Sequence, residues 1–180
     1  MEGKAKKIFI NGLILSLPLI LMSVLSYAFG LAENKFFGYL TIILLVVAIF
    51  LVQRNFRNSY LNGYGSYGQL FGNTLLMILI SLFVHGIFIY IFYKFIAPEQ
   101  INIILENAKA ILYQNDMLSD DQIEAAYEMQ KKMVTPLFLS ISSAFSYLIW
   151  GIITNLITSA INKKNKDPFT DAMKEIADNE

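Results

Sequence analysis

The amino-acid sequence predicts an all-α, polytopic membrane protein with four transmembrane helices and an extramembrane amphipathic helical hairpin between the third and the fourth. Four stretches, residues 8–32, 36–53, 58–93 and 133–162, contain no Asp, Glu, Lys or Arg and together cover 109 of 180 residues. Hydrophobic residues make up 56% of the chain and the mean hydropathy is +0.51, which is more than a soluble surface tolerates. A helix of about 20 apolar residues crosses a bilayer core and satisfies its own backbone polar groups. We therefore expect residues 1–180 to form a single membrane domain.

The first predicted span covers residues 8–29 and follows Lys4, Lys6 and Lys7. Pro18 predicts a kink, because proline removes one helical hydrogen bond. The same arrangement also describes a secretory signal peptide, with a small-x-small cleavage site at residues 28–30. The uncharged run lasts 25 residues, whereas the apolar part of a signal peptide has about 7–15. A retained span is favoured, and cleavage stays open as the alternative.

The second and third spans are predicted at residues 36–52 and 69–93. Between them, residues 53–58 form a polar, basic turn, and a Gly- and Tyr-rich stretch follows. The third span ends in aromatic residues, which are common where a helix meets the lipid headgroups. The motif Gly63-x-Gly65-x-x-Gly68 lacks the preceding strand and the later acidic residue of a dinucleotide site, so an interfacial turn is the better interpretation.

Residues 97–134 are charged and show helical periodicity, so they predict a helical hairpin outside the membrane. Pro98 suits the first turn of its first helix, and Asn115-Asp116 marks the end of that helix. Ser119 to Gln122 has the pattern of a capping box that begins the second helix. Glu124 and Glu128 are interpreted as a solvated face of this helix rather than a metal site. The fourth span is predicted at residues 137–161, and residues 162–180 form a polar tail.

The lysine and arginine residues near the membrane predict the orientation. The side that holds both termini carries eight of them, and the opposite side carries five, one of which, Lys109, is far from any span. Because positive residues favour the cytoplasmic side, both termini and the tail are expected in the cytoplasm. The hairpin is then external, which means periplasmic if the source is a bacterium with two membranes.

Composition excludes several classes of function. The formal charge is zero and no basic tract stands out, so no nucleic-acid partner is expected. The chain contains no cysteine, which rules out disulfides and thiolate chemistry, and a single histidine, which rules out a multi-histidine metal site. We expect no catalytic residues, no bound metal and no cofactor.

His85 is the single Asp, Glu, Lys, Arg or His residue inside a predicted span. With Ser81 it belongs to a semi-polar stripe that repeats every four residues along the third span. Intramembrane ionisable residues are functional candidates, and a histidine could carry protons or gate a path. A neutral imidazole hydrogen-bonded to a neighbouring helix is the structural alternative, and the sequence favours it.

Stripes of small and polar residues on the first, third and fourth spans predict a packed core, because small side chains let helices approach closely in lipid. The second span, with fewer such residues, is expected at the edge of this core, and Trp150 is expected to be buried against another helix. The same stripes could line a polar conduit if several chains assemble. The packing positions are Gly12, Ser16 and Ser23 in the first span, and Ser143, Gly151 and Thr154 in the fourth.

Short phrases in this layout carry a resemblance to a known family. They are Arg54-Asn55-Phe56-Arg57, residues 67–72 (YGQLFG), Ala97-Pro98-Glu99, and the hairpin segments 118–124 (LSDDQIE) and 133–136 (MVTP). The chain resembles an uncharacterised family of small four-span membrane proteins, a domain of unknown function found mostly in Bacteroidetes. The resemblance implies an inner-membrane location, and it implies no activity and no functional residue.

The sequence thus favours a non-enzymatic protein of the cell envelope that lies in the lipid bilayer and uses residues 98–134 to dock on a second copy, another envelope protein or the membrane surface. The alternative is a small oligomeric transporter or channel that uses the Ser, Thr and His85 stripes. An intramembrane enzyme is less favoured, because no span offers a carboxylate to act with His85.

Overall fold

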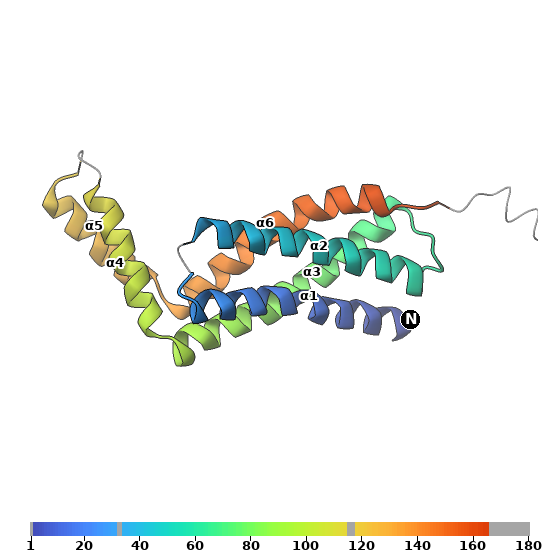
Figure 1. Ribbon diagram of the computed structural model, residues 1–180, viewed down its shortest axis with the longest axis horizontal. Coiled ribbons are helices and arrows are strands. Elements are labelled where there is room, and N and C mark those ends of the chain that lie inside the picture. Colours follow the sequence, from blue (N-terminus) through green and yellow to red (C-terminus); the bar gives the residue numbers. More distant parts are fainter. Residues whose placement is uncertain (1, 32–33, 115–117, 166–180) are drawn as a thin grey trace, which may run out of the picture. The chain divides into compact units, whose positions relative to one another are not determined.

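The computed structural model describes residues 2–31, 34–114 and 118–165, and this part of the chain is all-α (Figure 1). Four of its helices are long and apolar enough to cross a membrane, which confirms the predicted fold class. In chain order the elements are α1 (Glu2–Ala28), α2 (Lys35–Tyr60), α3 (Tyr67–Ile91), the π-helix η1 (Phe92–Ile96), α4 (Glu99–Tyr113), α5 (Asp120–Met133) and α6 (Pro136–Asn162).

The chain divides into two compact units, and the long helices α3 and α6 contribute to both. Unit 1 contains residues 1–82 and 147–180, and unit 2 contains residues 83–146. Each unit is described by itself below.

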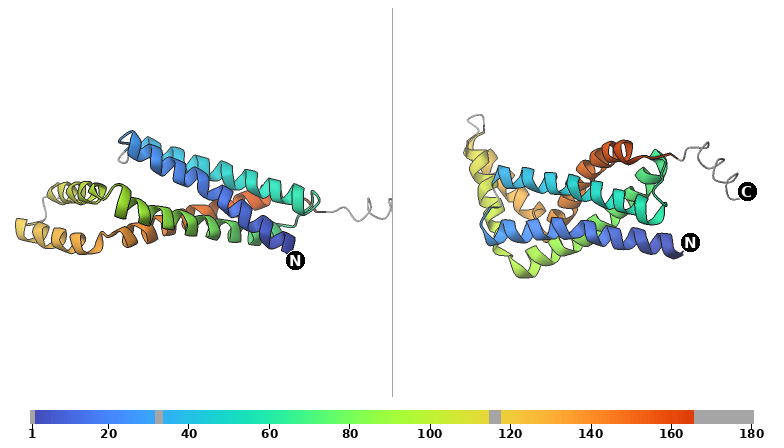
Figure 2. Two further views of the ribbon diagram at one scale, coloured as in Figure 1. Left: turned by 90° about the horizontal axis from the view of Figure 1, so that it is seen from below. Right: turned by 45° about the vertical axis from the view of Figure 1, so that its right-hand side comes forward.

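In unit 1, α1 and α2 form a helical pair, and both views of Figure 2 show them side by side. The end of α1 is set by Gly30, whose φ of +63° is readily adopted by glycine. The backbone N–H of Leu31 donates to the carbonyl of Ser26, and that of Gly30 donates to Tyr27, as in a Schellman C-cap. Asn34 then caps α2 by accepting from the N–H groups of two following residues.

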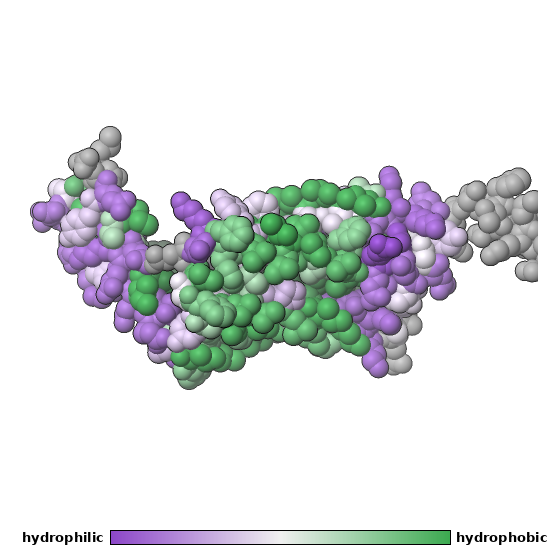
Figure 3. Space-filling model, viewed as in Figure 1, coloured by the Kyte–Doolittle hydropathy of each residue, from purple (hydrophilic) through white to green (hydrophobic). Residues whose placement is uncertain are grey.

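The core of unit 1 is apolar in its middle. The largest fully buried apolar side chains come from α1, α2 and α3: Leu15, Leu19, Ile49, Phe56, Leu70 and Met77. Figure 3 shows apolar residues over the outside of the same helices and hydrophilic residues gathered at the end where α1 begins. An apolar outside around an apolar interior is what a lipid environment allows.

Two expectations about this core are wrong. The second span does not simply lie at its edge, because Ile49, Gln53 and Phe56 in the C-terminal half of α2 are all fully buried. The first turns of α2 do agree with the expectation, since Phe36 and Tyr39 are exposed. Trp150 is 45% exposed rather than buried.

Unit 2 holds the C-terminal end of α3, η1, the α4–α5 hairpin and the beginning of α6. The capping box at Ser119 and Gln122 is present as predicted, with each side chain accepting from the other residue's backbone N–H. The predicted helix end at Asn115-Asp116 and most of the tail, residues 166–180, lie outside the described residues.

Candidate functional site

Five polar side chains from three spans meet in the interior of unit 1, where four of them, from α3 and α6, converge on the amide of the fifth, Gln53 of α2. Gln53 on α2 donates from Nε2 toward Thr74 Oγ1 of α3 at 3.2 Å, and toward Asn155 Oδ1 and Ser159 Oγ of α6 at 3.1 and 2.8 Å. Its Oε1 accepts from Asn162 Nδ2 at 2.9 Å. We call these five residues the polar clamp, because they join α2, α3 and α6 through side chains alone.

The clamp is inaccessible to solvent, and its polar atoms form hydrogen bonds. Gln53, Thr74, Asn155 and Ser159 are fully buried, and Asn162 is nearly so. Asn155 Nδ2 donates to the Phe71 carbonyl at 3.0 Å. A buried amide without partners would cost about 1–3 kcal/mol, and each hydrogen bond between membrane helices contributes about 0.6 kcal/mol on average. The clamp therefore fixes the register of three helices without any charge.

Backbone contacts extend the clamp to the end of the unit. Arg57 Nη1 donates to the Asn162 carbonyl at 2.7 Å, where α6 ends. Gly65 and Lys164 form an antiparallel bridge, with distances of 2.8 and 3.0 Å between the backbone nitrogen of one residue and the carbonyl oxygen of the other. The loop between α2 and α3 is thus fastened to the residues that follow α6.

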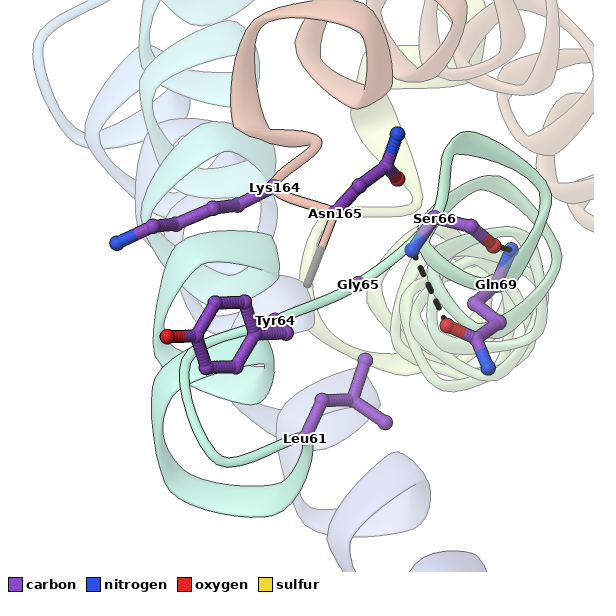
Figure 4. Close-up of a pocket in the computed structure, with 7 residues that line it drawn as sticks. All are labelled: Leu61, Tyr64, Gly65, Ser66, Gln69, Lys164 and Asn165. Carbon is purple, nitrogen blue, oxygen red and sulfur yellow. Dashed lines mark hydrogen bonds between the residues drawn. The ribbon is translucent and has the colours of Figure 1, made fainter. Parts of the chain in front are cut away.

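The glycine-rich motif forms this loop. Asn62 and Gly63 both adopt positive φ, +52° and +84°. Ser66 and Gln69 then make a reciprocal cap at the start of α3, with distances of 3.1 and 3.3 Å (Figure 4). The motif serves as a turn into a capped helix.

His85 and Ser81 lie one turn apart on α3 and are both buried. The His85 ring packs at a tilt against Phe88, with ring centroids 6.5 Å apart. The Ser81 hydroxyl has no hydrogen-bond partner among the described residues. In unit 2, Ser140 of α6 contacts α3 through its hydroxyl, which donates to the Gly86 carbonyl at 2.8 Å.

Two of the predicted packing glycines lie at close helix approaches. A Cβ atom placed on Gly12 would lie 2.7 Å from Ile80 Cβ, and one placed on Gly151 would lie 3.0 Å from Ile78 Cγ2. Thr154 and Ser16 are buried. The hydroxyls of Ser16, Ser23 and Ser143 donate to carbonyls of their own helices, those of Leu13, Leu19 and Ser140.

Sequence reasoning missed the clamp. Gln53 was assigned to a turn because the second span was expected to end at Val52, whereas α2 continues to Tyr60. The signal was present in α6, where Asn155, Ser159 and Asn162 recur at spacings of four and three on one face. Two amide side chains on the same helix face as a small hydroxyl would have indicated that a polar residue of another helix is buried against that face.

In unit 2, α4 and α5 are joined by one exposed ion pair and a small interior. Lys109 Nζ lies 2.8 Å from Glu124 Oε2 and 4.4 Å from the centre of the Tyr127 ring. The hydrogen bond that Lys109 donates to Glu124 raises the pKa of Lys109, and the one that Lys131 donates to Glu128 raises the pKa of Lys131. Leu105 and Ile123 are buried, whereas Ile111 is 67% and Met129 62% exposed.

Four helices fit to span a bilayer, with a polar interior built from neutral side chains, define a polytopic α-helical membrane protein. The sequence profile of one protein family, described as "Protein of unknown function (DUF4199)", matches residues 10–164. The chain belongs to this family, which confirms the resemblance to a domain of unknown function. Neither the curated proteins nor the solved structures contain a match.

Proposed function

We propose that the protein is a non-enzymatic component of the bacterial inner membrane, with both termini cytoplasmic, and that its α4–α5 hairpin docks on another protein of the envelope or on a second copy of the chain. The observation that carries this proposal is the exposed apolar surface of the hairpin. Besides Ile111 and Met129, the side chains of Ile103, Tyr113 and Met133 are exposed. Exposed apolar surface of this kind is typical of interaction sites.

The charge of the hairpin favours a protein partner over the lipid surface. Residues 98–134 contain seven acidic residues and three lysines, a formal charge of −4. Bacterial membrane surfaces that carry anionic lipids repel an acidic segment and attract basic ones. A partner with a basic or neutral groove and an apolar floor would match the hairpin better.

The transporter alternative has less support. Three of the stripe hydroxyls, those of Ser16, Ser23 and Ser143, donate to carbonyls of their own helices, and that of Ser140 donates to the Gly86 carbonyl of α3. They serve close packing between helices, as small-residue faces commonly do in membranes.

Crosslinking in intact cells tests the docking proposal. A photoreactive residue in place of Gln114, which is exposed at the end of α4, should capture one defined protein. The double substitution Ile111→Ser with Met129→Ser should abolish that product, because it removes the exposed apolar contacts. As a matched control, Asn102→Ser changes an exposed polar residue of the same helix and should leave the product intact.

Retention of the product in the double variant would refute docking through this surface, and so would capture of lipid alone. Deletion of residues 98–134, with a short linker in their place, should leave the spans inserted and abolish recovery of the captured protein by co-purification, a measurement that does not depend on the probe at Gln114. Because the chain has no cysteine, single substitutions at Gln114 and Lys6 to cysteine also report the orientation. An impermeant maleimide should label the first and not the second in intact spheroplasts.

A further inference from the structure

A pocket of about 320 Å³ opens in unit 1 where the loop before α3 meets the residues after α6. Its lining residues, drawn in Figure 4, are Leu61, Tyr64, Gly65, Ser66, Gln69, Lys164 and Asn165. We propose that this pocket binds the headgroup of an anionic phospholipid. This inference is independent of the hairpin and of its docking role.

The walls of the pocket are fixed before any ligand arrives. The bridge between Gly65 and Lys164 joins the two segments by two backbone hydrogen bonds. The reciprocal cap between Ser66 and Gln69 fixes the start of α3. A site with fixed walls loses little freedom on binding, which favours affinity.

The polar groups of the pocket suit a phosphate diester. Lys164 Nζ lies 5.4 Å from the centre of the Tyr64 ring. Figure 4 shows the Lys164 and Tyr64 side chains extending to the same side, with Asn165, Ser66 and Gln69 on the other. The ammonium group supplies the charge for a phosphate, while hydroxyl and amide groups can accept or donate to the polar part of a headgroup.

The surrounding charge is complementary to an anion. Seven basic residues lie at the end of unit 1 where α1 begins and α2 and α6 end, which we call the basic end: Lys4, Lys6, Lys7, Arg54, Arg57, Lys163 and Lys164. The helices α2, α3 and α6 contain no Asp or Glu. No ion pair within the described residues involves Lys164. Its charge is therefore not neutralised by the helices that form the pocket.

Several backbone N–H groups at the start of α3 already have acceptors. The N–H groups of Ser66 and Gln69 already donate to side chains of the cap, and that of Leu70 donates to the Ser66 carbonyl. Lys164 is the positively charged residue among those that line the pocket, which makes this lysine the residue to test.

Native mass spectrometry of the full-length protein in detergent provides the test, with phosphatidylglycerol and phosphatidylcholine added in parallel. We expect Lys164→Gln to lower the apparent affinity for phosphatidylglycerol about fivefold, the usual effect of one basic residue at an anionic membrane surface. Lys164→Arg should keep most of the affinity. The matched control Lys6→Gln removes the same charge from the basic end outside the pocket, and it should change the affinity less than about twofold.

Equal losses in Lys164→Gln and Lys6→Gln would overturn the proposal, because they would indicate diffuse attraction without a site. Displacement of the lipid by millimolar inorganic phosphate would overturn it as well, in favour of a free-anion site. Asp167 follows Lys164 by three positions in the sequence, so Asp167→Asn is a further variant to include in this experiment. Unchanged lipid binding in this variant supports the proposal, and a gain of more than about fivefold would identify the chain's own carboxylate as the occupant.

Discussion

The two units of this protein join their helices by different chemistry. In unit 1, neutral amides and hydroxyls from α2, α3 and α6 meet in a dry interior at Gln53. In unit 2, α4 and α5 meet through an exposed Lys109–Glu124 ion pair and bury small apolar contacts such as Leu105 and Ile123. Where water cannot compete, neutral hydrogen bonds are sufficient to fix helix register. Where water is present, exposed charges cost little and contribute little.

The largest expected effect comes from breaking the clamp. Gln53→Leu leaves Asn155, Ser159 and Asn162 without their shared partner, so we expect a loss of about 2–3 kcal/mol in the free energy of unfolding. Unfolding by SDS titration in mixed micelles measures it. Gln114→Leu makes the same chemical change at an exposed position of the hairpin, and it should stay within about 0.5 kcal/mol of the parent protein. Similar losses in both variants would contradict the contrast between the units.

A smaller effect distinguishes close from open helix approaches within unit 1. Gly12→Ala places a Cβ atom 2.7 Å from Ile80, so it should destabilise the protein by about 1–3 kcal/mol. Gly38→Ala adds the same atom to a helix where nothing lies within 4 Å. It should stabilise α2 by up to about 1 kcal/mol, because alanine loses less backbone freedom than glycine. If both substitutions had the same sign, tight packing at Gly12 would be refuted. Thermal unfolding of the purified proteins compares them.

The smallest effect concerns the exposed pair of unit 2. The pKa of Lys109 is raised by its hydrogen bond to Glu124, so the contribution of the pair is complete below the ordinary lysine pKa of about 10.4. It is lost as the pH rises through the raised pKa. A carbon-detected NMR titration of the lysine side chains measures this value directly. Glu124→Gln should return the pKa of Lys109 toward normal and leave most of the shift of Lys131, which depends first on Glu128.

Patterns in the sequence predicted the helices, but they did not predict the polar clamp. Long uncharged runs identified four spans, and the pattern at Ser119 and Gln122 identified a helix start, because both depend on residues adjacent in sequence. Gln53 was misplaced since a polar residue at the end of an apolar run resembles a loop residue. Its burial depends on Asn155 and Ser159, more than 100 residues later. The amphipathic patterns of α4 and α5 predicted that these helices pair. They did not predict the exposure of Ile111, because this depends on how few apolar contacts α5 offers to α4.

The clamp also constrains the order of biosynthesis. Three of its five members belong to α6, the last in chain order of the described helices, and Gln53 meets Ser159 across 106 residues of chain. Until α6 has entered the bilayer, the amide of Gln53 has no α6 partner, so the preceding helices cannot adopt their final register. Nascent chains arrested before α6 should therefore stay associated with the insertion machinery or be degraded, because the arrangement of α2 and α3 is completed only after α6 has been made.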